Sequence, residues 1–235
     1  MADLTVNEKR HAAVLAAIQR SPFLDATCGS CDELGEPLEE LLPLYEHNED
    51  WDEVRLDGDL GSCALRFMDL GAQWSTTGGL PEILGEYRIL HFYDVFDQLE
   101  GPEPLDDATE FQRQFLAELR HFDMTPRSGA GMMSFIRMQP NVSPLEIWFH
   151  DVADIGGEPY PPGYLRMDIT YCQYLDALLL TKGTYGWQYL YTDVRLSDAG
   201  FHLARTYLTR MLEVFPELFP EHDYAPLRAR LEERL

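Results

Sequence analysis

The chain has little positive charge. Of its 235 residues, 18 are lysine or arginine and 41 are aspartate or glutamate, which gives a formal net charge of −23. Only two residues, Lys9 and Lys182, are lysines. Nucleic acids and anionic lipids carry charge of the same sign, so we expect no nucleic acid and no membrane as a partner, and a basic protein as the favoured one.

Long apolar runs are also missing. No stretch approaches the roughly 20 apolar residues that a membrane span needs. The opening residues 1–20 hold a weak apolar stretch, 12–18, without a cleavage-like tail, so we expect no signal peptide. The four cysteines, Cys28, Cys31, Cys63 and Cys172, form no dense framework and suggest a reducing compartment. These features, with an acidic composition common in bacteria, predict a cytoplasmic protein.

The sequence lacks the common catalytic and cofactor motifs. Gly78-Gly79 and Gly156-Gly157 have neither the strand-to-helix context nor the lysine of a phosphate-binding loop. The serine of 128–131 has the wrong flanks for a nucleophile elbow. Cys28-Gly-Ser-Cys31 has no second pair of zinc ligands and lies between two expected helices, so we interpret both cysteines as loop residues. We expect no cofactor, no metal and no enzymatic activity.

Seven histidines are scattered along the chain. None has a second histidine three or four residues away, as a helical metal site would. His150-Asp151, at the end of an expected strand, could form half of an acid/base pair. A structural histidine is the simpler interpretation, and a hydrolytic site near His150 is kept as an alternative.

Hydrophobic periodicity predicts helices separated by clustered strands. Thr5 and Glu8 have capping-box spacing, and Thr170 begins the clearest helix, which Lys182-Gly183 ends. The expected helices cover about residues 5–20, 34–45, 107–122, 170–182 and 197–215, with a short amphipathic tail at 227–235. The expected strands cover about residues 63–67, 89–96, 133–138, 145–150 and 165–169, and residues 186–191 are expected to be extended.

This order shows no regular strand–helix–strand alternation. It predicts an α+β fold, with a largely antiparallel sheet of about five to six strands covered by helices. We expect a single domain over 1–235, made of a helical, acidic N-terminal part, 1–60, and a sheet-containing core, 60–220.

The densest acidic stretch lies between Glu46 and Asp59. It surrounds a single tryptophan, and we predict that it forms a loop on the protein surface. If this loop binds a partner, the tryptophan would be the anchor and the carboxylates would steer a basic protein. The candidate partner-binding residues are therefore Asp50, Trp51, Asp52, Glu53, Asp57 and Asp59. A merely solvated loop is the alternative.

Four aromatic residues, Tyr185, Trp187, Tyr189 and Tyr191, alternate along the chain. In a strand they would share one face. Such a face is most often part of a core, and an exposed edge or groove is the alternative.

Part of the chain resembles a known superfamily. The similar segments are Leu145–His150, Tyr164–Ile169 with the following Thr170–Leu179, and Gly183–Tyr189. They resemble the SUKH superfamily, which contains fungal cell-wall-synthesis regulators and bacterial immunity proteins that neutralise toxins. The resemblance spans about residues 133–215 and implies an α+β fold and binding of protein partners through variable surfaces; it transfers no site residue.

These observations together predict a non-catalytic protein-binding module of immunity or regulator type. Its expected partner is a basic protein such as a toxin, for example a nuclease, in a toxin–antitoxin-like pair. A structural accessory of a larger assembly is a further alternative.

Overall fold

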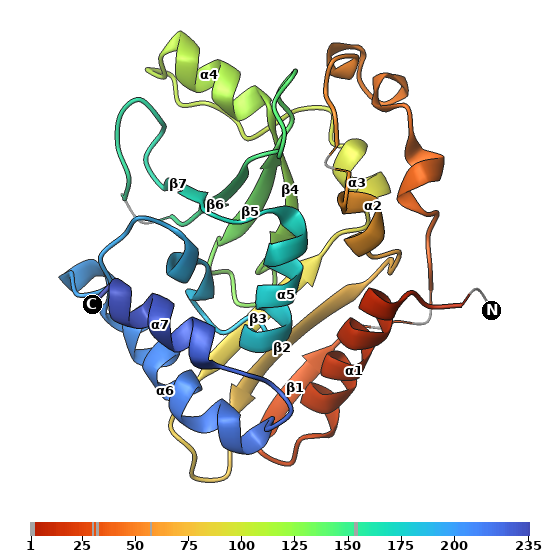
Figure 1. Ribbon diagram of the computed structural model, residues 1–235. Coiled ribbons are helices and arrows are strands. Elements are labelled where there is room, and N and C mark those ends of the chain that lie inside the picture. Colours follow the sequence, from red (N-terminus) through yellow and green to blue (C-terminus); the bar gives the residue numbers. More distant parts are fainter. Residues whose placement is uncertain (1–2, 30, 32, 57, 153–154) are drawn as a thin grey trace.

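One antiparallel sheet organises the structure (Figure 1). The computed structural model describes residues 3–29, 31, 33–56, 58–152 and 155–235. In this part of the chain seven strands pair in the order in which they occur, each antiparallel to the next. The strands are β1 Leu24–Cys28, β2 Leu70–Thr76, β3 Leu84–Ile89, β4 Leu119–Met124, β5 Met133–Arg137, β6 Ile147–His150 and β7 Tyr164–Met167.

Helices cover the sheet, with most of them on one face. Figure 1 shows α1, α5, α6 and α7 in front of the strands. The α-helices are α1 Val6–Arg20, α2 Leu60–Cys63, α3 Phe92–Phe96, α4 Glu110–Ala117, α5 Tyr171–Thr181, α6 His202–Leu218 and α7 Ala225–Glu233. The 3₁₀ helices are η1 Leu38–Leu41, η2 Leu44–Glu46, η3 Glu49–Trp51, η4 Trp187–Tyr191 and η5 Ala199–Phe201.

Alternation along β6 separates two hydrophobic cores. Ile147 and Phe149 belong to the main core under α5, whereas Trp148 packs on Phe115 of α4 in a smaller cluster. Because successive side chains of a strand point to opposite faces, α4 covers the face opposite to α5. The predicted α+β class with an antiparallel sheet is confirmed, and the number of strands is slightly higher than expected.

The predicted helix caps are confirmed at α1 and α5. The side chains of Thr5 and Thr170 accept hydrogen bonds from the backbone N–H groups of Glu8 and Gln173. The side chains of Glu8 and Gln173 in turn accept hydrogen bonds from the backbone N–H groups of the two threonines. Lys182 ends α5 in the left-handed conformation, with φ 52°. Within the described residues, no helix is long and apolar enough to cross a membrane.

Three of the expected elements in the N-terminal half are wrong. Residues 34–45 form η1 and η2 instead of one α-helix, because Pro37 and Pro43 cannot donate the hydrogen bonds of a helix interior. The strand expected at 63–67 does not form: Cys63 is the last residue of α2, and within the described residues only Phe67 makes an isolated bridge, to Leu34. The N-terminal part is not purely helical either, because β1 joins the sheet. The strand expected at 89–96 is the end of β3 followed by α3, which His91 caps.

The middle and the C-terminal half hold three further corrections. The helix expected at 107–122 ends at Ala117, and Phe122 belongs to β4. Residues 186–191 were expected to be extended, but Trp187–Tyr191 form η4 after Gly186, so their aromatic side chains do not share a strand face. Ser197 does not cap the long helix: η5 precedes α6, and Phe201 holds the cap position.

The sheet forks between β3 and β4. These two strands pair only at Ile89 and Asp123. At the other end of β3, the segment after α5 takes the place of β4: Glu86 donates its backbone N–H to the Gly183 carbonyl at 2.8 Å, and Tyr185 donates to the Leu84 carbonyl at 2.9 Å. The fork leaves room for a cleft between the two branches of the sheet.

Candidate functional site

The acidic stretch predicted as a loop is a chain of short turns. Asn48 caps η3 by accepting a hydrogen bond from the Asp50 N–H at 2.9 Å. The predicted exposure of Asp50, Asp52, Glu53 and Asp59 is confirmed. Asp57 lies outside the described residues.

Trp51 is not an exposed anchor, so this part of the prediction is wrong. Its side chain is 4% exposed and packs against Phe96 of α3, with ring centroids 6.1 Å apart. The guanidinium of Arg120 lies over the Trp51 ring, 5.0 Å from its centre. Burying an apolar side chain of this size in the core stabilises the fold more than leaving it at the surface of a polar turn. Trp51 therefore anchors the acidic turn to the core.

A groove of about 790 Å³ runs beside this turn. It brings the predicted residue Asp50 together with Glu100 and Glu103, two residues outside the predicted set. The sequence signal for them is the turn-forming segment Gly101–Pro104, where a glycine and two prolines adjoin both glutamates. We call this the acidic groove; its lining is Asn48, Asp50, Trp51, residues 99–104, Gln114, Ala117, Glu118, Arg120, Met138 and Pro140.

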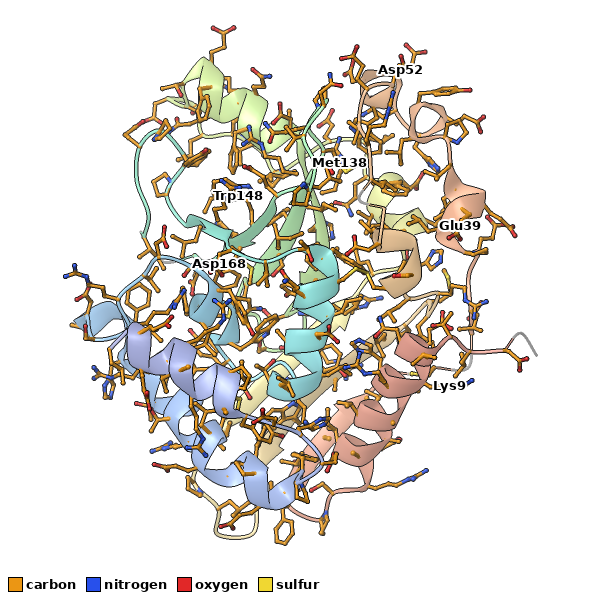
Figure 2. All side chains as sticks on the ribbon, in the orientation of Figure 1. Lys9, Glu39, Asp52, Met138, Trp148 and Asp168 are labelled. Carbon is orange, nitrogen blue, oxygen red and sulfur yellow. A yellow bond between two sulfur atoms is a disulfide. The ribbon has the colours of Figure 1, made fainter. Side chains whose placement is uncertain are left out.

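The acidic groove lies at the end of the molecule that carries η3 and α4. Figure 2 shows Asp52 at this end, above Met138, which lines the groove. Asp52 and Glu53 follow Trp51 directly and flank the groove without lining it. Asp59 lies at the beginning of α2 and is not part of the lining. The structure thus unites only part of the predicted set.

The arginines near the groove leave its acidic side chains without a counter-charge. Arg55 donates to the carbonyls of Asp52 and Val54, and Arg113 to those of three residues before α4, namely Leu105, Asp106 and Ala108. Among the described residues, none of Asp50, Asp52, Glu53, Glu100 and Glu103 makes a salt bridge within 4.0 Å. The negative charge of this face therefore remains available to a partner.

Arg120 lies in the floor of the groove. It is 2% exposed and donates to the carbonyls of Ala117 at 2.7 Å and Leu119 at 2.8 Å. Burial lowers the pKa of its guanidinium. Since it is bound to backbone oxygens and stacked on Trp51, Arg120 stiffens the floor rather than neutralising the rim.

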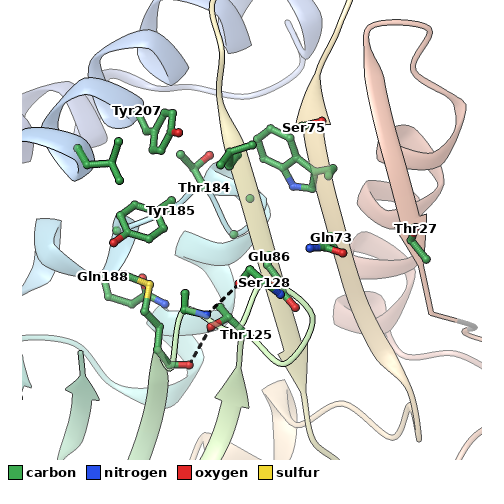
Figure 3. Close-up of a pocket in the computed structure, with 18 of the residues that line it drawn as sticks. Thr27, Gln73, Ser75, Glu86, Thr125, Ser128, Thr184, Tyr185, Gln188 and Tyr207 are labelled. Carbon is green, nitrogen blue, oxygen red and sulfur yellow. Dashed lines mark hydrogen bonds between the residues drawn. The ribbon is translucent and has the colours of Figure 1, made fainter. Parts of the chain in front are cut away.

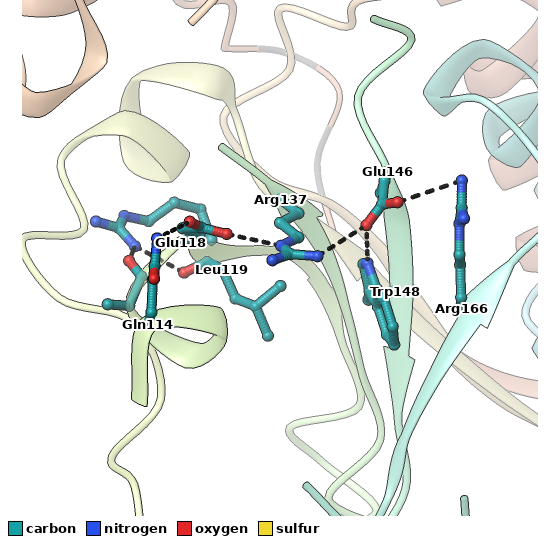
Figure 4. Close-up of polar contacts among 9 residues, drawn as sticks. Gln114, Glu118, Leu119, Arg137, Glu146, Trp148 and Arg166 are labelled. Atoms are coloured by element: carbon teal, nitrogen blue, oxygen red, sulfur yellow. Dashed lines mark hydrogen bonds and ion pairs between the residues drawn. The ribbon is translucent and has the colours of Figure 1, made fainter. Parts of the chain in front are cut away.

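A network of ion pairs holds α4 against the sheet (Figure 4). Arg137 of β5 binds Glu118 at 2.7 Å and Glu146 at 3.2 Å. Glu146 also binds Arg166 of β7 at 3.3 Å and accepts a hydrogen bond from the Trp148 indole at 3.0 Å. The carboxylate of Glu118 is thereby neutralised, so we assign it a structural role although it lines the groove.

The aromatic residues 185–191 mostly belong to the core. Trp187, Tyr189 and Tyr191 are buried, which confirms the core interpretation for them. Tyr185 is half-buried and lines the cleft at the fork of the sheet.

His150 and Asp151 are both held by structural contacts. The His150 ring stacks on Tyr164, with centroids 4.5 Å apart, and burial lowers its pKa. Asp151 accepts a hydrogen bond from the buried Tyr189 hydroxyl. Neither residue lines the acidic groove or the cleft at the fork. The hydrolytic site near His150 stays an alternative prediction.

The cysteine usage suggested a reducing compartment, yet two of the four cysteines are paired in the structure. Cys63 of α2 and Cys172 of α5 form a disulfide bond. Folding brings together two cysteines that are 109 positions apart in the sequence. Cys28 is the last residue of β1 rather than part of a loop between helices, and burial raises the pKa of its thiol.

Comparison with known proteins adds no relative: no family model, no curated protein and no solved structure matches the chain. The resemblance to the SUKH superfamily therefore stays a prediction.

Proposed function

We propose that this chain is a non-catalytic binding protein of immunity or regulator type, which binds a basic protein partner through the acidic groove. The observation that carries the proposal is the convergence of Asp50, Glu100 and Glu103 on one groove, near arginines that are bound to backbone carbonyls.

The groove also offers apolar contact area. Leu99, which lines it, is 83% exposed, and Pro102 and Pro104 restrict the backbone beside it. Protein interfaces combine an apolar centre with a polar rim. The groove supplies both within about 790 Å³, large enough for several side chains of a partner.

Electrostatics favours a partner with clustered lysine or arginine. The net charge of −23 attracts such a protein over long range, and the unpaired carboxylates of the groove orient it at short range. A nuclease toxin fits this description, because a surface that binds nucleic acid is basic.

The proposal is tested with purified proteins encoded by genes next to this one. Each is titrated into the chain by calorimetry, and then into a variant with Asp50→Lys, Glu100→Lys and Glu103→Lys. We expect a basic partner to bind the unaltered chain and to lose at least about tenfold in affinity for the variant.

The matched control reverses three exposed glutamates outside the groove, Glu213, Glu217 and Glu232, to lysine. Both variants change the net charge equally, so the control isolates the position of the charges. An equal loss of affinity in the two variants would reject the groove as the binding site. Catalytic turnover by the chain alone would reject the non-catalytic role.

A further inference from the structure

We infer that the cleft at the fork of the sheet is a second binding site, which takes a guanidinium group. This site is distinct from the acidic groove, because no described residue lines both. Its volume is about 410 Å³, within the range of small-molecule sites.

The fork itself builds the cleft. One wall is the outer face of β1–β3, and the other is formed by residues 125–132 together with the segment that follows α5. Gly183, with φ +73°, allows that segment to approach β3: a Cβ atom there would lie 2.8 Å from the Glu86 carbonyl oxygen. In Figure 3, Tyr185 and Gln188 lie on one side of the cleft and Gln73 on the other, with Glu86 between them.

The charge of the lining has one sign. Asp25 and Glu86 contribute carboxylates, and no lysine, arginine or histidine is among the described lining residues. Glu86 is only 7% exposed and makes no salt bridge among the described residues, although burial of a carboxylate normally requires a partner.

Backbone donors satisfy Glu86 in part. Its two oxygens accept hydrogen bonds from the N–H groups of Arg127 at 2.6 Å and Ser128 at 2.8 Å. The guanidinium of Arg127 is directed elsewhere and donates to the Thr27 carbonyl at 3.0 Å. A carboxylate oxygen accepts two hydrogen bonds, so each oxygen of Glu86 can accept one more, and its charge is not neutralised by a side chain.

Gln188 provides the independent observation. Its side chain is 4% exposed and lines the cleft, yet its carbonyl oxygen has no hydrogen-bond partner. The other end of the Gln188 amide hydrogen-bonds the Tyr174 hydroxyl, which in turn donates to Asp123 at 2.6 Å, so only the carbonyl oxygen of Gln188 is left without a partner. A buried acceptor without a donor is costly, and a ligand that donates an N–H group there removes the cost.

The aromatic residues select among possible cations. The rings of Tyr185 and Tyr207 meet edge to face, 5.8 Å apart, at the cleft. A guanidinium group is planar, carries five N–H donors and stacks on aromatic rings. A guanidinium group can therefore donate to more than one acceptor of the lining, Glu86 among them, while lying against a tyrosine, which a compact ammonium group does less well.

The test uses butylguanidinium as the probe and butylurea as its neutral, nearly isosteric counterpart. Binding to the complete chain is measured by calorimetry. We expect saturable binding of butylguanidinium, at least about tenfold tighter than that of butylurea, because charge-assisted hydrogen bonds are the stronger ones. Butylammonium should bind more weakly than butylguanidinium.

Two variants locate the site. Gln188→Met removes the free carbonyl at similar volume, and Glu86→Gln removes the charge. Each should weaken butylguanidinium binding at least about fivefold. The matched controls, Gln19→Met and Glu213→Gln, alter exposed residues outside the cleft and should leave the affinity unchanged. If Glu86→Gln does not fold, Gln188→Met and the comparison with butylurea decide.

A peptide probe distinguishes the two sources of a guanidinium group, an arginine side chain of a polypeptide and a small molecule. A blocked Gly-Arg-Gly peptide that binds more tightly than butylguanidinium indicates an arginine side chain of a polypeptide; weaker binding indicates a small molecule. No saturable binding of butylguanidinium, or equal binding of butylurea, overturns the proposal. These probes address residues outside the acidic groove, so either proposal can fail without the other.

Discussion

Trp51, beneath the acidic groove, shows that a local sequence pattern does not reveal which residues are buried. Trp51 stands among acidic residues, and nothing next to it in the sequence indicates burial. Its partners, Phe96 and Arg120, come from α3 and β4, far along the chain. The exposed carboxylates were predictable from their charge alone, whereas the position of the tryptophan depends on tertiary contacts that the sequence does not display.

Burial of Trp51 predicts a stability effect rather than a pure binding effect. Trp51→Ala should lower the free energy of unfolding by about 3–5 kcal/mol, because it removes a buried aromatic side chain and leaves a cavity. Chemical denaturation measures this. Tyr45→Ala, at an aromatic residue that is 50% exposed, is the control and should cost less than about 1 kcal/mol. Equal, small effects would show that Trp51 is exposed after all.

Glu8 predicts acid sensitivity. Burial alone would raise its pKa, but hydrogen bonds from Arg66 and from the Thr5 N–H outweigh burial and hold the pKa at about 2, below the ordinary 4.5. The unfolded chain therefore takes up the proton first. The stabilisation is complete above pH 4.5 and is lost as the pH falls towards 2.

Glu8→Gln tests this origin of the acid sensitivity. It should lower stability by about 3 kcal/mol at pH 7, since it breaks a buried ion pair, and by much less near pH 2. Unfolding free energies measured across this range decide. Glu39→Gln, at an exposed residue, should keep the pH dependence of the unaltered chain; a parallel curve for Glu8→Gln would contradict the assignment.

At the scale of elements, a helix was predicted correctly where a capping residue and an apolar stripe occur together. The helix α5 was predicted from Thr170 to Lys182 because both ends carry their own signals. The prediction failed for residues 89–96, where His91 caps a short helix directly after a strand and both elements are buried. A run that is apolar on every side shows no period, so strand and helix look alike.

The cap of α5 predicts a measurable loss. Thr170→Ala should destabilise the protein by about 1 kcal/mol, because it leaves the Gln173 N–H without its acceptor. Thermal unfolding measures the effect. Thr206→Ala, within α6, serves as the control and should be neutral or slightly stabilising, since alanine is the better helix former. A neutral Thr170→Ala would show that the cap does not contribute.

The disulfide bond links α2 to α5 and predicts both a thiol count and a stability effect. Denatured, unreduced protein should expose two reactive thiols, those of Cys28 and Cys31, out of four cysteines. Replacing Cys63 and Cys172 by alanine should cost about 4–5 kcal/mol, because the bond closes a loop of 109 residues. Four reactive thiols in the unreduced protein would contradict the bond.

For the whole molecule, the sequence predicted the fold class and the net charge, but not which segments come together in space. The α+β class and the antiparallel sheet followed from the order of the elements, whereas the fork between β3 and β4 and the meeting of residues 48–51 with 99–104 required the fold. The cytoplasmic location stays a prediction, and the disulfide removes the argument that cysteine usage gave for it, since disulfides persist mainly in oxidising compartments.

The central claim is that the charges of the acidic groove, rather than the net charge, recruit a basic partner. The most direct measurement is the association rate constant at increasing ionic strength, for the unaltered chain, the groove variant (Asp50, Glu100 and Glu103 to lysine) and the control variant (Glu213, Glu217 and Glu232 to lysine). We predict that the groove variant associates at least about tenfold more slowly at low salt and with a much weaker salt dependence, while the control stays close to the unaltered chain. Identical rates and salt dependences for the two variants would contradict the claim.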